Sequence, residues 1–577
     1  MLREEESSVK AMHKSHVGLL AVIFLVYIMT ACTGEVFNDP EKIDGSESES
    51  ESSAYHDNGP LTKYNPPIEV SFVRNLSDVV ENNVLSVLKH ETFEDNRWTR
   101  LYENELGIKI VYDWVVRGNE GTDTYNQKLN MTLSSGELPD IIPVNVIQLK
   151  KLAEEDMIED MTVWYENFAT PLTKEVLLHE GRSPFDMATI DGKLMAIPEV
   201  HSPIENAMFV WIRTDWLDRL NLDPPKTMVD VRKISQAFTE QDPNRSGSDN
   251  TFGLAVSKKL WGGFAGLEGF MAGFNAYPNI WLEDAEGKLV YGSVQPEVRD
   301  ALLALQSMAR NGEIDSEFGI KNDNRVSEDI AAGKIGMMYG EQWNSIWPLQ
   351  LNIDNDPEAQ WKAFPIVSND NDVPKVPLRF KTEKFFTVRK GYEHPEAIIK
   401  LFNMHLEKNF GENAEYEYYY APPEAESVWQ LSPVQPAPPK KNLVAFREIE
   451  AARKANDTSQ LTGEAKTIQE KLESFASGTD EGFALWGWER IYGPEGSMGI
   501  MGQYEENNQL LYDKFFGAPT QTMIRRQSTL EMMQDEVFMK IILGDPIETF
   551  DKFVEDWYQL GGRQITNEVN QWYSTLQ

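Results

Sequence analysis

The sequence predicts an α/β fold that is large enough for two lobes. Segments typical of strands alternate with segments typical of helices, an order that favours parallel strands covered by helices. The chain has 577 residues, and the part beyond a polar N-terminal region would fill two large lobes at roughly 100–200 residues a domain. Cys32 is the only cysteine, so no disulfide can form within the chain and the fold depends on its hydrophobic core.

The first predicted elements follow the polar N-terminal region. Ile68, Val70 and Phe72 alternate with polar residues, which is typical of a strand with one buried face. The next expected elements are a helix end leading into a strand at Leu106–Tyr112, a helix at Gln127–Leu133, a turn at Ser135–Pro139 and a short buried strand at Asp140–Val144.

Three helices farther along have clear signals in the sequence. One opens at Gln295-Pro296, with proline in its first turn, and Gly312 lies just past its end. A second begins at His394-Pro395, and a third places Ile234 and Phe238 one turn apart. Strands are expected between these helices at Phe252–Val256, Lys334–Tyr339 and Lys384–Val388.

The N-terminus carries an apolar run, Val17–Met29, that is shorter than the roughly 20 residues needed to span a bilayer. Lys10 and Lys14 precede the run, and small residues lead up to Cys32. This is the anatomy of a secretory signal. Because it ends on a cysteine, it resembles a bacterial lipoprotein signal, in which a peptidase cuts before the cysteine and the new N-terminus carries lipid.

The resemblance makes residues 1–31 the signal peptide and Cys32 the lipidated residue. Met29 stands where such signals usually have leucine. The alternative is a secreted protein with one incidental buried cysteine. The acidic residues near Met1 fit a signal poorly, so we hypothesise that translation begins at Met12.

Residues 32–65 are predicted to form an acidic tether. Ser46–Ser53 consists of serine and glutamate, a composition that buries too little apolar surface to offset the entropy of ordering. The whole chain has 54 Lys and Arg against 92 Asp and Glu, a formal net charge of −38. A surface this acidic repels phosphate backbones and anionic lipids, which argues against nucleic acid or a broad membrane surface as a partner.

The common catalytic signatures are missing from the sequence. It contains no Gly-x-x-x-x-Gly-Lys-Ser/Thr phosphate loop, no Gly-x-Ser-x-Gly elbow and no His-Glu-x-x-His zinc helix. With 8 His and no cysteine besides Cys32, a zinc or nucleophilic site is poorly supplied. A glycosidase needs two carboxyl groups at a defined distance from one another, and a sequence alone does not give that distance.

Five segments carry motifs that occur together in one family. They are an "SGxxPDI" segment at Ser134–Ile142, a "DGKxYxxP" segment at Ile190–Pro198, an "RxDWLDxLG" helix at Ile212–Leu220, a "GKxGM" strand at Ala331–Met337, and a C-terminal ending at Gly561–Tyr573. In order and spacing they resemble the extracellular solute-binding proteins of bacterial ABC importers, and most closely the large lipoprotein subgroup associated with oligosaccharides. Met195 stands where tyrosine is usual, and Asn221 replaces glycine.

The resemblance implies a type II periplasmic-binding-protein-like clamshell with crossover hinge strands. On that template, residues 66–198 plus 380–440 form lobe 1, and residues 199–379 plus 441–577 form lobe 2. Such lobes close by hinge motion around a ligand held between them. The implied protein is a monomeric, non-enzymatic receptor anchored by lipid to the extracellular face of a bacterial cell membrane, of Gram-positive type. It would bind an oligosaccharide and deliver it to the ABC permease subunits.

Sugar sites combine flat aromatic side chains with carboxylates or amides, because sugars have apolar faces and hydroxyl rims. Trp343 with Glu341 is the first choice, since the family places a cleft position directly after the "GKxGM" strand. The other candidate ligand residues are Trp261, Phe264, Trp486, Trp488, Asp140 and Glu199. The tyrosine-rich segment Tyr416–Tyr420 either rims the cleft or packs in the interior.

A loop that begins at Asp242 has oxygen-bearing residues at the spacing of a calcium loop, with Gly247 at the sharp turn. The subgroup often carries calcium at this place. The candidate ligands are Asp242, Asn244, Ser246, Ser248 and Asn250. Gly253 stands where a bidentate glutamate would close the loop, and only Asp242 is charged among the candidates. The loop is therefore open to two interpretations, a structural calcium site or an Asx-type turn at a helix end. No cofactor is otherwise required.

Two other functions remain open at the level of sequence. The same fold could serve a surface sugar sensor or an adhesion module, and a secreted glycan-active enzyme could carry the same anchor. Permease genes beside this one would favour import, a lone sensor-kinase gene would favour signalling, and turnover of glycan would favour an enzyme.

Overall fold

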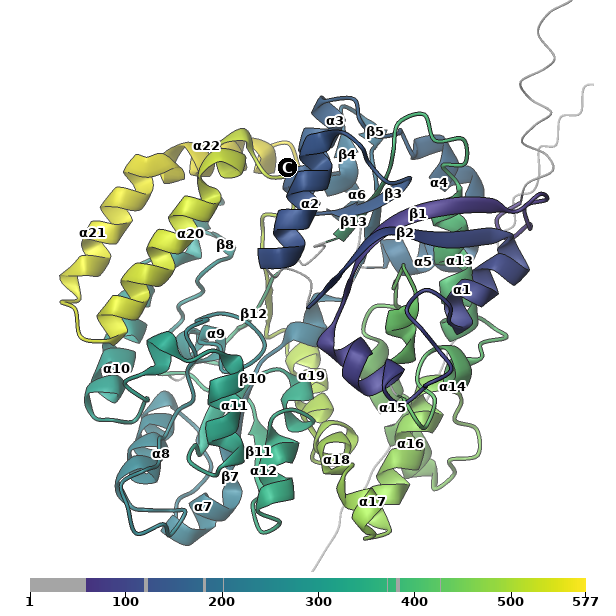
Figure 1. Cartoon of the computed structure of the whole chain (residues 1–577). Helices are drawn as coiled ribbons and strands as arrows, with labels where there is room; N and C mark the ends of the chain where they lie inside the picture. Colours follow the sequence, from purple (N-terminus) through teal and green to yellow (C-terminus); the bar gives the residue numbers. More distant parts are fainter. Residues whose placement is uncertain are drawn as a thin grey trace, which may run out of the picture. The chain divides into compact units, whose positions relative to one another are not determined.

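The computed structural model describes residues 59–118, 123–179, 183–200, 202–370, 372–379, 384–425 and 427–576, and residues His56–Gln577 form one compact unit. The predictions for residues 1–31 and Cys32, and most of the predicted tether, lie outside the described residues. The folded part mixes helices with short strands (Figure 1). This confirms the predicted α/β class.

The buried apolar residues gather into two main clusters. The first core draws on Tyr64–Val200 and Phe385–Val434, and the second core draws on Ile204–Leu378 and Leu443–Val569. Each core is therefore built from two separate stretches of the chain. A third, small cluster consists of Tyr416, Tyr420 and Ala421.

The first core holds the early strands and helices. Its elements are β1 (Ile68–Leu76), α1 (Arg97–Leu101), β2 (Ile108–Arg117), α2 (Asp123–Ser135), β3 (Ile141–Val144), α3 (Val146–Glu154), α4 (Thr162–Phe168), α5 (Pro171–Leu178), α6 (Ser183–Ala188), β4 (Thr189–Ile190), β5 (Lys193–Leu194), β6 (Ile197–Glu199), β13 (Lys384–Val388), α13 (Ala397–Phe410) and α14 (Tyr416–Tyr419). β1 and β2 run side by side as a parallel pair in register Ile68 with Ile108 (Figure 1).

The prediction of parallel strands is confirmed for β1 and β2 and is wrong for the neighbouring sheet. That sheet has the order β3-β13-β6, and β13 runs antiparallel to both neighbours. The reason lies in the path of the chain. β13 returns to the first core from the second, so no crossover helix links it to β3 and fixes a parallel direction.

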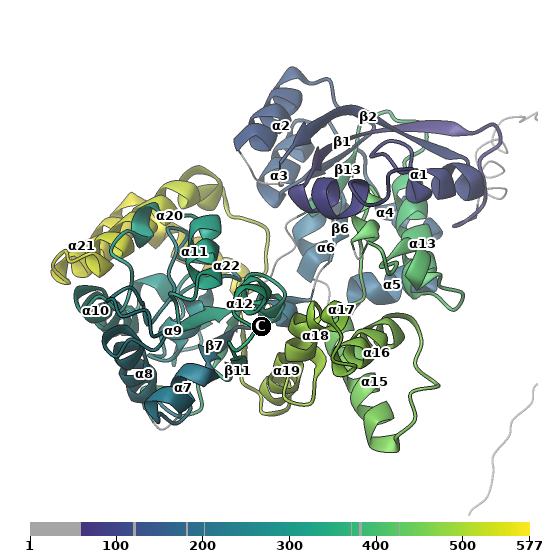
Figure 2. The same ribbon diagram turned by 60° about the horizontal axis from the view of Figure 1, so that its bottom comes forward.

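The second core contains the remaining elements. They are β7 (Phe209–Arg213), α7 (Thr214–Leu220), α8 (Met228–Glu240), α9 (Glu268–Ala272), β8 (Trp281–Glu283), β9 (Leu289–Tyr291), α10 (Glu297–Arg310), α11 (Asp323–Ala331), β10 (Met337–Gly340), α12 (Leu349–Asn355), β11 (Trp361–Phe364), β12 (Val376–Leu378), α15 (Lys441–Ala455), α16 (Gly463–Ala476), α17 (Asp480–Phe483), α18 (Trp486–Tyr492), α19 (Ser497–Glu506), β14 (Leu510–Tyr512), α20 (Gln521–Ile542), α21 (Glu548–Trp557) and α22 (Arg563–Tyr573). Figure 2 shows α15 to α19 as one group of helices.

β7 is the central strand of the second core. It is buried along its whole length and pairs antiparallel with β10 on one side and β11 on the other. The helix that follows, α7, ends at Asn221, whose φ of 54° is left-handed. Asparagine tolerates this conformation better than most residues, so it can replace the glycine that is usual in the motif.

The predicted strand Phe252–Val256 is not formed. Phe252 makes only an isolated bridge to Ile335, and the N–H groups of Leu254 and Ala255 donate to two different segments, at the carbonyls of Glu313 and Met337. A β-carbon at Gly253 would lie 2.2 Å from Ser235 Oγ. The segment is therefore pressed against α8, and packing there overrides the strand propensity of its side chains.

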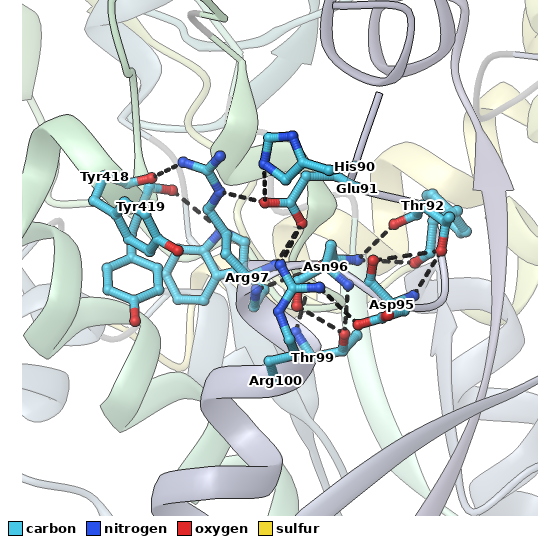
Figure 3. Close-up of polar contacts among 12 residues, drawn as sticks. His90, Glu91, Thr92, Asp95, Asn96, Arg97, Thr99, Arg100, Tyr418 and Tyr419 are labelled. Carbon is cyan, nitrogen blue, oxygen red and sulfur yellow. Dashed lines mark hydrogen bonds and ion pairs between the residues drawn. The ribbon is translucent and has the colours of Figure 1, made fainter. Parts of the chain in front are cut away.

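Glu91 is the centre of a buried ion-pair network beside α1 (Figure 3). Its carboxylate is 1% exposed, accepts a hydrogen bond from Arg97 Nε at 3.0 Å and from the Arg97 N–H at 2.8 Å, and lies 2.9 Å from the Arg100 guanidinium. Arg97 in turn donates to the carbonyl of Tyr418, and Trp98 Nε1 donates to that of Tyr419 at 3.1 Å. The network thus ties α14 to α1.

Glu91→Gln is expected to lower the free energy of unfolding by about 3 kcal/mol or more, because it leaves the Arg97 guanidinium buried without its counter-ion. Urea denaturation measures the loss. Glu81→Gln is the matched control, since its partner Arg117 is 79% exposed and such a pair contributes at most about 1 kcal/mol. Equal losses in the two variants would contradict the role given to the buried network.

Asp513 lies where β12 and β14 run parallel to one another. Its N–H donates to the carbonyl of Leu378 at 2.9 Å, and its Oδ1 accepts the N–H groups of Trp281 at 2.9 Å and Phe515 at 3.0 Å. The protein around the carboxyl removes it from water, and this desolvation raises the pKa of Asp513 to about 7.

Stability is expected to fall as pH rises from about 4 to about 7, because in that window the folded protein holds a proton on Asp513 that the unfolded chain has already released. Asp513→Asn keeps an acceptor oxygen and should remove this part of the slope in a series of melting curves. Asp284→Asn is the control, since Asp284 lies in an exposed turn and accepts two backbone N–H groups at 3.0 and 2.8 Å. An unchanged slope in Asp513→Asn would refute the assignment.

Candidate functional site

A cavity of about 370 Å³ is lined by residues from both cores and from the segments that pass between them. The stretch of chain that returns to the first core contributes His405, Tyr420 and Trp429, and the second core contributes Glu205, Asn206, Glu341, Gln342 and Trp343. The connecting segments contribute Ser202, Gln435–Pro438, Lys441 and Asn442. We call this the main cavity. Its size falls within the range of small-ligand sites, about 300–1,000 Å³.

Aromatic rings come to the main cavity from both sides. Trp343 follows β10 in the short helical turn Gln342–Ser345, and its ring is stacked with Trp347 at a centroid distance of 6.1 Å. On the other side, Tyr420 is stacked with Trp429 at 5.6 Å. Flat aromatic faces of this kind are suited to the apolar face of a sugar ring.

The Glu91 network described above positions Tyr420. It fixes the carbonyls of Tyr418 and Tyr419 against α1, and Tyr420 comes directly after them. Tyr420 also stacks on Tyr416 at 4.6 Å. The ring is therefore held from two directions before any ligand arrives, which lowers the entropy that binding must overcome.

Glu205 has one carboxylate oxygen without a protein partner. Its Oε2 accepts a hydrogen bond from Asn442 Nδ2 at 2.7 Å, whereas Oε1 is buried and has no hydrogen-bond partner among the described residues. Burial raises the pKa of Glu205. Buried polar atoms are normally satisfied, so an unpaired oxygen on a residue that lines a cavity is the kind of acceptor that a ligand hydroxyl can complete.

The charges around the main cavity sum to negative. Glu341 accepts a hydrogen bond from Trp343 Nε1 at 2.7 Å and lies with Glu205 among the lining residues. Burial alone would lower the pKa of Lys441, but Glu464 at 2.5 Å raises it well above the usual value, so this cation is already paired. Burial lowers the pKa of His405 to about 3, so its ring is neutral at physiological pH.

Two of the predicted ligand residues, Trp343 and Glu341, line the main cavity. The other six lie elsewhere. Trp261 is buried and donates from Nε1 to Asp535 at 2.6 Å, and Phe264 packs on Trp347 at 5.0 Å. Trp486 is buried in α18, while Trp488 is half-buried beneath Lys471, whose Nζ is 3.5 Å from its ring centroid.

The two predicted carboxylates, Asp140 and Glu199, are engaged with protein groups. Asp140 pairs with Arg389 at 2.7 Å and accepts hydrogen bonds from Ser71. Glu199 is 2% exposed, lies 3.4 Å from Lys384 and accepts the Gln435 N–H at 2.8 Å. Neither is among the residues that line the main cavity.

Sequence reasoning missed Glu205, Trp429 and Asn442. Each lies in a short segment without a motif, and only the folded chain brings them together. Tyr420 belongs to the tyrosine-rich segment Tyr416–Tyr420, for which two interpretations were open. Both Tyr416 and Tyr420 pack in the small third cluster, and Tyr420 also lines the main cavity.

The predicted calcium ligands converge on one point. Ser246 Oγ lies 3.2 Å from Asp242 Oδ1, 3.0 Å from the Ser248 carbonyl and 3.0 Å from Asn250 Oδ1, and Asn244 Nδ2 donates to Asn250 at 3.1 Å. These contacts are hydrogen bonds within the loop, Asn244 turns its amide nitrogen toward Asn250, and Asp242 brings the only charge among the predicted ligands. Among the described residues, no group of three or more His, Cys, Asp or Glu could hold a metal ion.

A cavity that combines aromatic faces with amide and carboxylate groups, and that both cores line, has the chemical groups suited to binding a solute. The sequence profile of the bacterial extracellular solute-binding proteins matches residues 90–408, more than half of the chain. The chain belongs to this family, whose members are non-enzymatic components of transport systems. It is therefore an extracellular solute-binding protein and not an enzyme.

Two proteins of Bacillus subtilis (strain 168) are similar to this chain. The polygalacturonan/rhamnogalacturonan-binding protein YtcQ is 26% identical over 266 residues, and the lipoprotein LipO is 27% identical over 239 residues. These matches cover 45% and 41% of this chain and 50% and 45% of the relatives. The chain thus spans about half the length of the curated relatives that it matches.

The fold also matches a solved structure, that of the alginate-binding protein AlgQ2 without calcium ion. The match covers 90% of this chain and 100% of AlgQ2, with a TM-score of 0.61 and 14% identity. At this identity the likeness shows the fold alone. Within the described stretches of residues 59–576, no helix has both the length and the hydrophobicity needed to cross a membrane.

Proposed function

We propose that this protein is the substrate-binding subunit of an ABC importer for an oligosaccharide, and that the ligand occupies the main cavity. The observation that supports this best is the unpartnered Glu205 Oε1 in a cavity that also presents Trp343 from one side and Trp429, stacked on Tyr420, from the other. A sugar would satisfy the carboxylate with a hydroxyl and cover the rings with its C–H faces.

The two cores correspond, in this proposal, to the two lobes of a clamshell, with residues 66–198 plus 380–440 in lobe 1 and residues 199–379 plus 441–577 in lobe 2. The connecting segments then act as the hinge. A ligand that contacts both lobes favours the closed state by its difference in affinity for the two states, and the permease would recognise the closed form.

Delivery to a permease requires that the receptor stay near the membrane. We propose that cleavage after residue 31 leaves Cys32 as a lipid-bearing N-terminus, and that residues 32–65 tether the lobes to the extracellular face of the membrane. The similarity to the lipoprotein LipO supports this anchoring. A flexible chain of this length reaches roughly 30 Å, and its like charges extend it further.

Trp343→Ala is expected to abolish the rise in melting temperature that a cognate oligosaccharide causes, because the platform that contacts the sugar is lost while the half-buried ring adds little to the fold. A thermal-shift panel of oligosaccharides provides the measurement. Trp164→Ala is the matched control: Trp164 is equally half-buried but lies in α4, away from the main cavity. A retained shift in Trp343→Ala, or a large loss of stability without ligand, would count against the proposal.

The loop Asp242–Asn250 is proposed to bind calcium weakly. Four of its oxygen-bearing side chains converge, but a single carboxylate provides little attraction for a divalent cation.

Calcium at about 5 mM is expected to stabilise chelator-treated protein by about 1–2 kcal/mol, if the dissociation constant lies at about 10⁻⁴–10⁻³ M as in other extracellular modules. Titration calorimetry and melting curves measure this. Asp242→Asn should abolish the effect, and Asp457→Asn, an exposed turn aspartate whose side chain accepts the Ser459 N–H at 3.0 Å, should not. No heat at millimolar calcium would leave the loop as an Asx-type turn.

A further inference from the structure

A second, smaller cavity of about 210 Å³ lies in the first core at the ends of β1 and β3. We call it the basic cavity. Arg74 and Lys384 line it together with neutral polar groups such as Asn75, Ser77 and Gln430. None of the residues that the structure describes around it is an aspartate or glutamate. This is unexpected in a chain with 92 acidic and 54 basic residues.

Within the described part of the chain, Arg74 has hydrogen-bond partners but no carboxylate counter-ion. Its guanidinium donates to the carbonyls of Leu431 at 3.1 Å and Gln430 at 2.9 Å, and lies 4.9 Å from the centroid of the Phe93 ring. These partners are all neutral, and no carboxylate of the described residues lies within ion-pair distance of Arg74. The two hydrogen bonds use two of the five N–H donors of the guanidinium, so the group is held in place with donors to spare.

Lys384 is balanced by Glu199, which lies 3.4 Å from it and is 2% exposed. Glu199 also accepts the Gln435 N–H at 2.8 Å, so this carboxylate faces protein groups and is not among the residues lining the basic cavity. Arg74, Lys384 and Glu199 together carry a net charge of +1. Among the described residues, the charge beside the basic cavity is therefore positive, whereas the net charge of the whole chain is negative.

The two cavities are neighbours. Gln435 lines both of them, and its side-chain amide donates to the carbonyls of Gln430 and Ser432, each at 3.2 Å. On the far side of Gln435, the main cavity presents Glu205 and Glu341. A ligand that reaches across Gln435 therefore meets positive charge at one end and negative charge at the other.

We propose that the ligand is an acidic hetero-oligosaccharide, with the carboxylate of one sugar unit in the basic cavity and uncharged units in the main cavity. The proposal rests on the proposed function and adds the substrate class to it. A cavity of about 210 Å³ is smaller than a typical ligand site and suits a single sugar unit. A polymer of acidic units alone would place a second carboxylate beside Glu205 and Glu341, which disfavours it by like-charge repulsion.

The test compares oligosaccharides by calorimetry on the full-length mature protein. The probes are glucuronoxylan and rhamnogalacturonan fragments that each carry one terminal uronate, the same fragments with the carboxylate reduced to a primary alcohol, and galacturonate oligomers of equal length. The best uronate-bearing fragment is expected to bind at least tenfold more tightly than its reduced twin and than the galacturonate oligomer. Its advantage should shrink as salt rises, because screening weakens charge-assisted contacts.

Arg74→Gln is expected to erase the advantage of the acid over its reduced twin while leaving the affinity for the twin within about twofold. Arg325→Gln is the matched control, since Arg325 is 69% exposed and pairs with Glu328 on the surface of α11. If Arg74→Gln melts early because the Gln430 and Leu431 carbonyls lose their donor, Ser77→Asp is the second variant: it adds a carboxylate to the lining of the basic cavity, keeps an acceptor for the Val80 N–H and leaves Arg74 in place, and it should also erase the advantage of the acid.

The outcomes separate the two proposals. Equal binding of the acid and its reduced twin overturns the acidic substrate class and leaves oligosaccharide binding standing. An acid preference that survives in both Arg74→Gln and Ser77→Asp overturns the assignment to the basic cavity. Failure of every probe, and of a broad panel of neutral oligosaccharides, counts against the proposed function itself.

Discussion

One buried carboxylate joins all three passages of the chain between the two cores. Glu199 is the last residue of β6, where the chain first leaves the first core; Lys384, at 3.4 Å, begins β13, where the chain returns; and Gln435, whose N–H donates at 2.8 Å, lies in the last passage. A charge that is 2% exposed is stable only with such partners. The three passages are therefore fixed to one another at this point. Both partners of Glu199 line cavities: Lys384 lines the basic cavity, and Gln435 lines both cavities.

This arrangement explains why two cavities of opposite charge can lie side by side. Glu199 neutralises Lys384 from the protein side, which leaves the charge of Arg74 to the basic cavity. Across Gln435, Glu464 neutralises Lys441 in the same way, which leaves the charges of Glu205 and Glu341 to the main cavity. In each case a glutamate neutralises the lysine beside the cavity. The remaining charges, positive at Arg74 and negative at Glu205 and Glu341, face the space where a ligand would lie.

Much of the fold could be predicted from local signals in the sequence. Proline at the first turn and glycine after the end located α10, and the alternation at Ile68, Val70 and Phe72 located β1. The failures have a common cause. Phe252–Val256 has the composition of a strand but is pressed against α8, and β13 is a strand whose direction depends on a chain path through the other core. Neither the packing against α8 nor the path of the chain can be inferred from the residues of the segment alone.

The residues of the candidate site also differ in whether local sequence signals could predict them. Trp343 and Glu341 follow a motif strand and lie two residues apart, so the sequence could point to them; whether they bind ligand stays a prediction. Glu205, Trp429 and Asn442 come from three segments that share no motif, and they meet only in the folded chain. Trp261 and Phe264 show the opposite case, since aromatic residues beside a glycine-rich turn were natural candidates for stacking but are buried in the second core. Side-chain type alone does not separate a platform from a core residue, whereas burial and an unpaired partner atom do.

The charge of the whole chain and the charge of its cavities act at different ranges. At physiological ionic strength, screening limits the field of exposed charges to about 8 Å, so the net charge of −38 governs long-range repulsion and solubility more than what happens inside a cavity. Within the basic cavity, Arg74 acts at contact distance and in partial isolation from water, where one charge outweighs many remote ones. An acidic protein can therefore bind an acidic solute, provided that the carboxylate of the solute contacts a cation inside a cavity, away from the acidic residues of the surface.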